Sequence, residues 1–285
     1  IAEAQLTALF MQSIAYGIHM VTFTACMYTW FHRDGATSRG SVRWLWMTIA
    51  ITFFVIGTLD VTLNFYHNLS AFILQDGGAD PNATFSRPSS WINIIRLVLF
   101  YLSAAISDAA LIYRCWIVYA HSRYQALVGT TALLLWLAGI TMAIIVLYHF
   151  STITAANSIP MIGELQPFTY AYFFVVLALN VFTTGLIIVR LREVSKRTAA
   201  FFKSTWRVTS RLDIGHVALI IIESALLYTL TVFLTAVLTF VKTNISYGLS
   251  DISLEAAGIA FDLIIIRIWM GVSTEQTYTL SEATQ

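Results

Sequence analysis

Seven long apolar stretches, separated by shorter polar segments, dominate the pattern of the chain. They cover residues 6–30, 45–69, 92–119, 126–150, 167–189, 217–240 and 252–270. Each reaches the roughly 18 residues that an apolar helix needs to cross the hydrocarbon core of a bilayer. The pattern therefore predicts an all-α fold, in which residues 1–285 form a single domain that is an integral membrane bundle of seven transmembrane helices.

Composition leads to the same prediction. Hydrophobic residues make up 58% of the chain and charged residues 11%, whereas a soluble domain carries about 25% charged residues. The expected partners are therefore membrane lipids, in the plasma membrane or an endomembrane. A net charge of +1 offers no concentrated basic surface, so no nucleic-acid partner is expected.

The charges of the loops predict an orientation. The second, fourth and sixth loops hold only Arg87 and Lys242 as basic residues. By the positive-inside rule, the N-terminus is expected outside and the C-terminus in the cytoplasm. The Asn-Ala-Thr sequon at Asn82 lies in the second loop, so Asn82 is predicted to be glycosylated on the outer face. The other loops hold the remaining basic residues outside the spans, at Arg33, Arg39, Arg43, Arg123, Arg190, Arg192, Lys196, Arg197, Lys203, Arg207 and Arg211.

The fifth loop, from Arg190 to Asp213, combines these basic residues with Phe201, Phe202 and Trp206. This mixture predicts either a helical extension or an amphipathic segment on the inner leaflet. The segment is a candidate contact for a cytoplasmic partner. An ordinary positive-inside flank explains the same charges.

Polar residues within the spans are informative, because a charged side chain costs about 2.5–3.5 kcal/mol at the middle of a bilayer and must face the bundle interior. The second and third spans place five of them at similar depth in the outer half, namely Asp60, Asn64, His67, Asn93 and Arg96. We expect an ion pair between Asp60 and Arg96, and a ligand pocket that opens outward, with His149 and Glu255 near the same rim. A structural network that joins the two helices explains the pattern equally well.

A second set of charged residues falls in the inner half of the bundle: Asp108, Arg114, Glu223, Asp262 and Arg267. We expect an inner ionic network in which Arg114 or Arg267 pairs with Glu223 or Asp108. Asp108 and Arg114 are six residues apart on one span, so we expect each to pair with another helix and not with the other. Such a network serves either as a switch that opens when the sixth span moves or as a static clamp. A protonated carboxyl, with Asp262 as the first candidate, is a further alternative to ion pairing.

Several chemistries are excluded by the residues present. The lysines are Lys196, Lys203 and Lys242, all in or next to loops, so none is placed for a retinal Schiff base. The histidines lack metal-ligand spacing, and neither an Asp-rich diphosphate–Mg²⁺ motif nor a Gly-x-Ser-x-Gly elbow occurs. We therefore predict no metal site, no cofactor and no conventional catalytic residue. Acid catalysis by a buried carboxyl among aromatic residues remains open.

Three runs of sequence also resemble a known family. Residues 108–116 (DAALIYRCW), 223–229 (ESALLYT) and 258–267 (GIAFDLIIIR) are similar to a large family of uncharacterised seven-helix membrane proteins of mushroom-forming (basidiomycete) fungi. The resemblance covers essentially the whole chain and implies a fungal membrane protein, but no activity. Similarity to G-protein-coupled receptors is topological, since the third span lacks an Asp/Glu-Arg-Tyr triplet and the seventh lacks Asn-Pro-x-x-Tyr.

Together these features favour a receptor-like membrane protein that senses a small or lipidic ligand through an outward-facing polar pocket. One alternative is an intramembrane enzyme that acts on a lipid or isoprenoid, by acid-initiated cyclisation for example. Another is a transporter or a structural subunit of a membrane assembly. The chain shows no internal repeat, which counts against an inverted-repeat transporter.

Overall fold

The computed structural model describes residues 2–32, 40–74, 85, 90–120, 122–152, 158–202, 228–241 and 245–283, and all regular structure within them is helical. The all-α prediction is therefore confirmed. The elements are α1 (Ala2–His32), α2 (Gly40–Leu69) with its π-helical continuation η1 (Ser70–Leu74), α4 (Trp91–Val118), α5 (Gln125–Thr152), α6 (Ser158–Phe202), the helix Tyr228–Phe240 and α8 (Ile245–Ala283).

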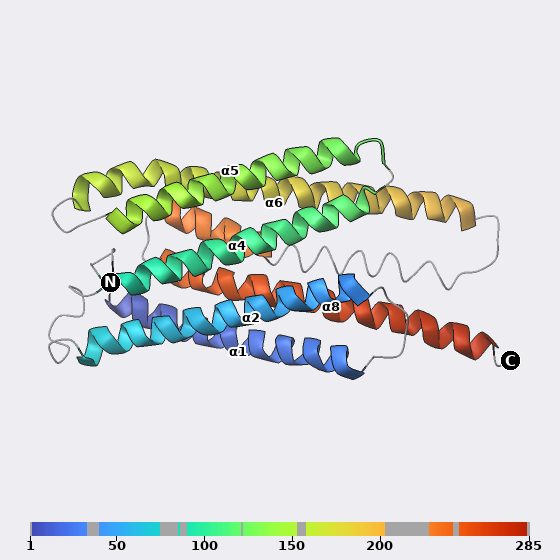
Figure 1. Cartoon of the computed structure of the whole chain (residues 1–285), viewed down its shortest axis with the longest axis horizontal. Coiled ribbons are helices and arrows are strands. Elements are labelled where there is room, and N and C mark those ends of the chain that lie inside the picture. Colours follow the sequence, from blue (N-terminus) through green and yellow to red (C-terminus); the bar gives the residue numbers. More distant parts are fainter. Residues whose placement is uncertain are drawn as a thin grey trace.

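The helices lie side by side as one elongated bundle (Figure 1). Consecutive helices run in alternating directions, and the N- and C-termini lie at opposite ends (Figure 1). This arrangement follows from the sequence, because apolar helices with short connections pack against their neighbours in antiparallel fashion. The described turn between α4 and α5 spans only a few residues around Ser122.

Five helices are long and apolar enough to cross a membrane. They are α1, Trp44–Leu74, α4, α5 and Leu165–Arg190, with 26 to 31 residues and a mean hydropathy between 1.3 and 2.3. At about 1.5 Å per residue, each exceeds the roughly 30 Å hydrocarbon core of a bilayer. The helix Tyr228–Phe240 is apolar but shorter in its described part. The chain therefore has the helices of a membrane protein.

Several helices extend beyond the predicted spans. α6 continues to Phe202 and α8 to Ala283, although the apolar pattern ended at residues 189 and 270. The part of the basic segment up to Phe202 is thus a helical extension, one of the two structures expected for it. The helices are longer than the predicted spans because hydropathy shows only where the chain ceases to be apolar. A helix can continue through Arg, Glu and Lys, which have high helix propensity.

α8 is the central helix of the bundle. Every residue from 253 to 262 is buried, and α8 packs against α1, α2 and α4. α1 contributes a buried stripe with three- and four-residue spacing at one side, formed by Ala8, Gln12, Ala15, His19, Cys26 and Trp30. Its other side exposes large apolar side chains such as Phe10 and Val21. Gln12 and His19 thus face the interior of the bundle, whereas large apolar side chains of α1 face outward, a pattern compatible with a helix exposed to lipid.

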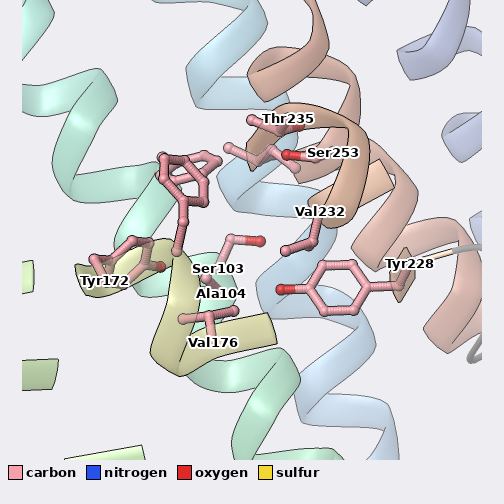
Figure 2. A pocket seen from close by; sticks show the side chains of 11 residues that line it. Ser103, Ala104, Tyr172, Val176, Tyr228, Val232, Thr235 and Ser253 are labelled. Carbon is pink, nitrogen blue, oxygen red and sulfur yellow. The ribbon is translucent and has the colours of Figure 1, made fainter. Parts of the chain in front are cut away.

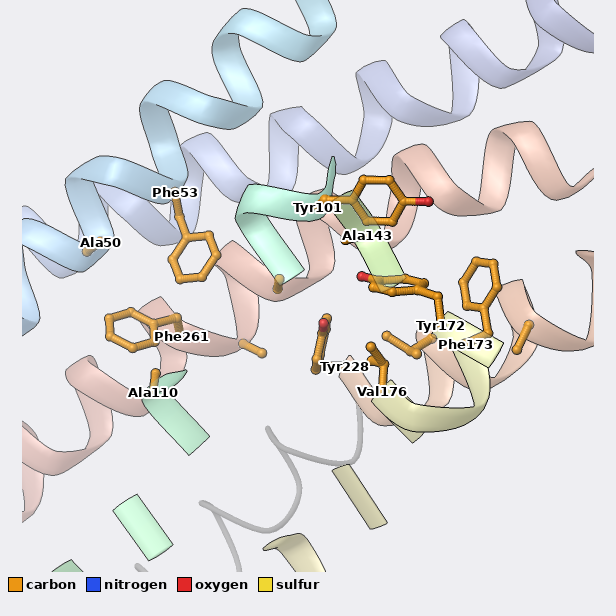
Figure 3. Close-up of a cluster of buried hydrophobic side chains, with 14 of the residues drawn as sticks. Ala50, Phe53, Tyr101, Ala110, Ala143, Tyr172, Phe173, Val176, Tyr228 and Phe261 are labelled. Atoms are coloured by element: carbon orange, nitrogen blue, oxygen red, sulfur yellow. The ribbon is translucent and has the colours of Figure 1, made fainter. Parts of the chain in front are cut away.

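Aromatic side chains fill much of the interior between these helices (Figure 3). The rings of Tyr101 on α4 and Tyr172 on α6 meet edge to face, with centroids 4.7 Å apart. Phe53 of α2 and Phe261 of α8 are in contact at 5.5 Å. Such pairs contribute about 0.5–1.5 kcal/mol beyond the burial of their area, so they help to fix α4 against α6 and α2 against α8.

Candidate functional site

The side chain of Arg96 joins three helices near the end of the bundle that holds the N-terminus. Its Nε donates a hydrogen bond to Oδ1 of Asp60 on α2 at 3.1 Å, and its Nη2 donates to Oδ1 of Asp251 on α8 at 2.7 Å. Asp60 is 2% exposed, whereas the side chains of Arg96 and Asp251 are 13% and 14% exposed. The expected ion pair between Asp60 and Arg96 is therefore confirmed.

Amide side chains extend this contact to α1. Nε2 of Gln12 donates to Oδ2 of Asp60 at 2.6 Å, and Nδ2 of Asn64 donates to Oε1 of Gln12. Asn64 also donates to Oδ2 of Asp251 at 3.2 Å, and Asn68 donates to Oδ1 of Asn64 at 3.1 Å. We call this set the Arg96 network; it consists of Gln12, Asp60, Asn64, Asn68, Arg96 and Asp251. Most of its polar groups bind one another, although Oδ1 of Asn68 has no hydrogen-bond partner among the described residues. The side chains expected to line an outward-facing pocket are thus largely engaged with each other.

The other residues expected at this pocket have different contacts. His67 is buried and meets Phe85 edge to face, with centroids 5.0 Å apart. The backbone N–H of Asn93 donates to Oγ of the N-cap residue Ser90 at 3.4 Å, so Asn93 lies in the first turn of α4. His149 stacks on Phe168 at 5.7 Å. A ligand-binding role for these residues remains a prediction.

A second buried polar group lies between α1 and α8. Nδ1 of His19 is 2.6 Å from Oε2 of Glu255, and its Nε2 is 3.8 Å from Oδ2 of Asp262. Oγ1 of Thr22 donates to the same Asp262 oxygen at 3.2 Å. We call His19, Thr22, Glu255 and Asp262 the His19 cluster. Its imidazole and both carboxyl groups belong to residues that are 0% exposed.

Two glycines make room for the His19 cluster. A Cβ atom on Gly57 of α2 would lie 2.7 Å from Oε2 of Glu255, and one on Gly258 of α8 would overlap the ring of His19. Real Cβ atoms do not approach other heavy atoms so closely. The backbones of α2 and α8 therefore border these polar groups directly, and a side chain at either position would have to displace Glu255 or His19.

The described residues expected to form one inner ionic network lie in different parts of the bundle. Oδ1 of Asp108 accepts a hydrogen bond from Nδ2 of Asn180 on α6 at 3.0 Å. The guanidinium of Arg114 instead lies over the rings of Trp46 and Phe261, at 5.2 and 5.3 Å from their centroids, as a cation–π contact. Asp108 and Arg114 therefore contact other helices and not each other, as expected, but these described contacts are with an amide and with aromatic rings and not with opposite charges. The two side chains are six residues apart on one helix and face different neighbours.

The remaining inner residues are placed differently. Asp262 belongs to the His19 cluster, where its described polar contacts are with His19 and Thr22 of α1. Arg267 lies farther along α8 and has interactions of its own. Glu223 lies outside the described residues, and so does any contact that Arg114 or Arg267 makes with it. The glycosylation site predicted at Asn82 is also outside the described part of the chain.

Sequence reasoning missed Gln12, His19 and Asp251 as partners. A signal for them was present in the spacing. Gln12 and His19 are seven residues apart on the stripe of α1 that also carries small alanines. Asp251, Glu255 and Asp262 follow at intervals of four and seven along one face of α8. Two polar faces of this kind on apolar helices predict that the helices pack together.

A small cavity, the core pocket, lies between α4, α6, α8 and the helix Tyr228–Phe240 (Figure 2). Its volume is about 10 Å³, which is room for roughly one water molecule. Figure 2 shows the hydroxyl groups of Ser103 and Tyr228 pointing into the space between α4 and the helix Tyr228–Phe240. The lining residues come from α4, α6, that helix and α8: Phe100, Ser103, Ala104, Tyr172, Phe173, Val176, Tyr228, Val232, Thr235, Ser253 and Leu254.

Ser103 is the polar group of the core pocket that lacks a partner. It is 1% exposed, and its Oγ has no hydrogen-bond partner among the described residues. The hydroxyls of Thr235 and Ser253 donate to carbonyl groups within their own helices, at 2.8 and 2.7 Å. A buried hydroxyl without a partner costs free energy, so Ser103 is available to bind a polar group that enters the pocket.

Two further cavities of about 20 Å³ share walls with the core pocket. One is bordered by Asp108 and Trp136 and shares Tyr172 with the core pocket. The other is bordered by Arg114 and shares Tyr228. Figure 3 shows Tyr172 and Tyr228 in the middle of the aromatic cluster. Tyr172 and Tyr228 therefore each border two cavities.

Comparison of the chain with protein-family models, with curated proteins and with solved structures found no match. Within the described ranges, no group of three or more His, Cys, Asp or Glu side chains is arranged to hold a metal ion. Fold and site together define a class of protein, a bundle of apolar helices suited to a membrane, with buried polar groups around a central helix and an aromatic pocket beside them.

Proposed function

We propose that the chain is a receptor-like protein with seven transmembrane helices that senses a small or lipidic ligand in the core pocket. The observation that supports this proposal is the buried, unpartnered Oγ of Ser103 in an aromatic cavity bordered by four helices. Ligand sites in proteins are largely apolar cavities with a few well-placed polar groups. The expected ligand therefore has a mainly apolar body and one hydroxyl or carbonyl group that hydrogen-bonds to Ser103.

A receptor-like role follows from the walls of the pocket. A ligand larger than one water molecule must displace Tyr172 or Tyr228, which come from α6 and from the helix Tyr228–Phe240. On the α4 face that carries Ser103, Arg96 lies seven residues earlier, about two turns along the helix. Displacement of these side chains would therefore change the packing of α4 and of the helices that the Arg96 network joins.

The ligand proposal can be tested with the purified protein in lipid nanodiscs. We would measure thermal stabilisation by a panel of fatty acids, fatty alcohols, isoprenoid alcohols and sterols. A compound that binds at Ser103 should stabilise the unchanged protein, and Ser103→Ala should weaken its binding about 2- to 10-fold, as expected for loss of a hydrogen bond worth about 0.5–1.5 kcal/mol. Ser13→Ala, on the exposed side of α1, is the matched control.

Three outcomes distinguish the alternatives. Equal affinity in the unchanged protein and in Ser103→Ala would place the ligand elsewhere and contradict the proposal. Recovery of a chemically altered compound would favour an intramembrane enzyme, for which Asp108 is the acid already placed on the wall of an aromatic cavity; Asp108→Asn should then abolish the conversion. Stabilisation by none of the panel would count against a lipidic ligand.

We further propose that the N-terminus lies outside and the C-terminus in the cytoplasm. The opposite positions of the two termini in the bundle (Figure 1) and the loop charges support this orientation. The basic segment that begins in α6 at Arg190 would then face the cytoplasm, where a partner could bind it.

This orientation can be tested by glycosylation at Asn82. When the protein is expressed in a eukaryotic host, glycosidase treatment should increase its electrophoretic mobility, and Asn82→Gln should remove most of that shift. Labelling that shows the fifth loop outside would contradict the orientation.

A further inference from the structure

The His19 cluster holds more acid than base, and it does so in the interior of the bundle. His19 of α1 lies between two carboxyl groups of α8, 2.6 Å from Glu255 on one side and 3.8 Å from Asp262 on the other. The three residues are 0% exposed. One imidazole can neutralise one carboxylate at most, so the second acid lacks a positive partner within the cluster.

The surrounding charges do not correct this excess. From α2, Asp60 faces the cluster beyond Gly57, and from α8 Asp251 lies one turn from Glu255. Both are acids that already share the guanidinium of Arg96 from α4. A further titratable neighbour is the buried thiol of Cys26 on α1. In the described contacts of the Arg96 network and the His19 cluster, four carboxyl groups share the guanidinium of Arg96 and the imidazole of His19.

Hydrogen bonding gives an independent sign of the same excess. In the described structure, Oε1 of Glu255, Oδ1 of Asp262 and Nε2 of His19 have no hydrogen-bond partner. A carboxylate oxygen buried without a donor is costly, and a buried acid that cannot be paired takes up a proton instead. A proton on either carboxyl removes its charge and leaves an O–H group and a neutral acceptor.

The surroundings of the cluster favour a proton over a metal ion. The described His, Cys, Asp and Glu side chains form no group of three with the geometry of a metal site. The backbones at Gly57 and Gly258 close off the space beside Glu255 and His19, since even a Cβ would overlap them. A proton needs no additional space, because it occupies an existing oxygen or nitrogen atom.

We propose that the His19 cluster is a proton-binding site whose occupancy controls the packing of α1 against α8. At neutral pH at least one proton resides on Glu255 or Asp262, and the imidazole bridges the two side chains. Loss of this proton to water at alkaline pH leaves two carboxylates that flank one imidazole. Their repulsion then weakens the contact of α1 with α8. The exchange involves one proton and no other reactant.

A route for the proton is present on α8. The side chains of Arg96 and Asp251 are the partly exposed members of the Arg96 network. Glu255 follows Asp251 by four residues and Asp262 follows Glu255 by seven, so the three acids share one face of the helix. At about 5.4 Å per turn, the acids extend over roughly three turns into the bundle. The proton is therefore expected to enter at the Asp251 end.

Infrared difference spectroscopy of the full-length protein in lipid nanodiscs tests the site. The spectrum at neutral pH minus that at alkaline pH should contain the carbonyl stretch of a protonated carboxyl, which shifts in D₂O. Glu255→Gln or Asp262→Asn should reduce this band, because one of these residues carries the proton of the cluster. Asp108, a buried acid held by a neutral amide, can supply the part that persists. Glu193→Gln, which changes an exposed acid of α6, is the matched control and should leave the band unchanged.

The thermal stability of the unchanged protein provides a second measurement that does not depend on the folding of a variant. Its stability should fall over the same alkaline range in which the band disappears. Absence of a protonated-carboxyl band, or a band whose intensity neither substitution reduces, would overturn the proposal. Disappearance of the band on addition of NaCl at constant pH would also overturn it and identify a cation site. If the thermal stability does not fall over the pH range in which the band disappears, the proton does not control the packing of α1 against α8. None of these results depends on a ligand in the core pocket.

Discussion

Replacement of Gly258 by alanine should destabilise the protein strongly, because the added methyl group has no space. Its Cβ would overlap the ring of His19, which lies between Glu255 and Asp262. Overpacking of this kind costs about 1–3 kcal/mol. Displacement of His19 would also leave the Glu255 carboxyl without its hydrogen bond, which costs about 1–3 kcal/mol more for a buried acceptor. The measurement is the thermal midpoint of the purified variant in detergent or nanodiscs.

Gly185→Ala is the matched control for this experiment. A Cβ on Gly185 in α6 would meet no heavy atom within 4 Å. Alanine has the higher helix propensity, so this change should be neutral or stabilise the protein by about 0.5–1 kcal/mol. Similar thermal midpoints for Gly258→Ala and Gly185→Ala would show that α8 does not approach His19 as closely as the structure indicates.

Replacement of Arg96 by glutamine should lower the stability of the protein by a comparable amount, because a largely buried positive charge is lost. Arg96 is the cation between Asp60 and Asp251, and it ties α4 to both α2 and α8. Its removal leaves two largely buried carboxylates facing each other, and loss of one member of a buried ion pair costs about 3–5 kcal/mol. Arg96→Lys should be intermediate, because an ammonium is a point charge that lacks the two-sided geometry of the guanidinium. Thermal unfolding of each variant measures the effect.

Rescue distinguishes charge from shape at this site. When Asp60→Asn and Asp251→Asn are added to Arg96→Gln, no uncompensated charge remains, and much of the lost stability should return. Glu193→Gln is the control for loss of an exposed ion pair, because it removes the charge that contacts Arg190 on a half-exposed side chain. It should change the thermal midpoint little, since exposed pairs contribute only about 0–1 kcal/mol. A triple variant no more stable than Arg96→Gln would show that the network acts through the shape of the arginine rather than its charge.

The pairing of Asp60 with Arg96 could be predicted from sequence for a physical reason. Charged side chains in apolar spans must face the interior and find partners, and these two lie at similar depth on consecutive spans. For Arg114 and Asp108 the same reasoning predicted partners on other helices, which the structure shows, but it did not predict the kind of partner. A neutral amide on α6 satisfies Asp108, and two aromatic rings surround the guanidinium of Arg114. Amides and aromatic rings are frequent enough in the chain that sequence does not single them out as partners.

The chain by itself determined the class of fold. Apolar segments longer than about 18 residues predict helices that can cross a bilayer, and the structure is helical with five such segments in its described part. The spacing of polar residues along each helix also determined which side chains share a face, as with Asp60 and Asn64 of α2. These properties depend only on neighbours within one helix, whose geometry is fixed by the backbone.

Only the tertiary structure decided which faces meet. It placed α8 at the centre, so that Asp251 shares Arg96 with Asp60, and His19 of α1 lies between Glu255 and Asp262. It also showed why glycine occupies positions 57 and 258, because side chains of neighbouring helices lie directly against the backbone there. These features arise from the packing of helices distant in sequence, and the complementary shapes that select one packing are spread over several helices at once.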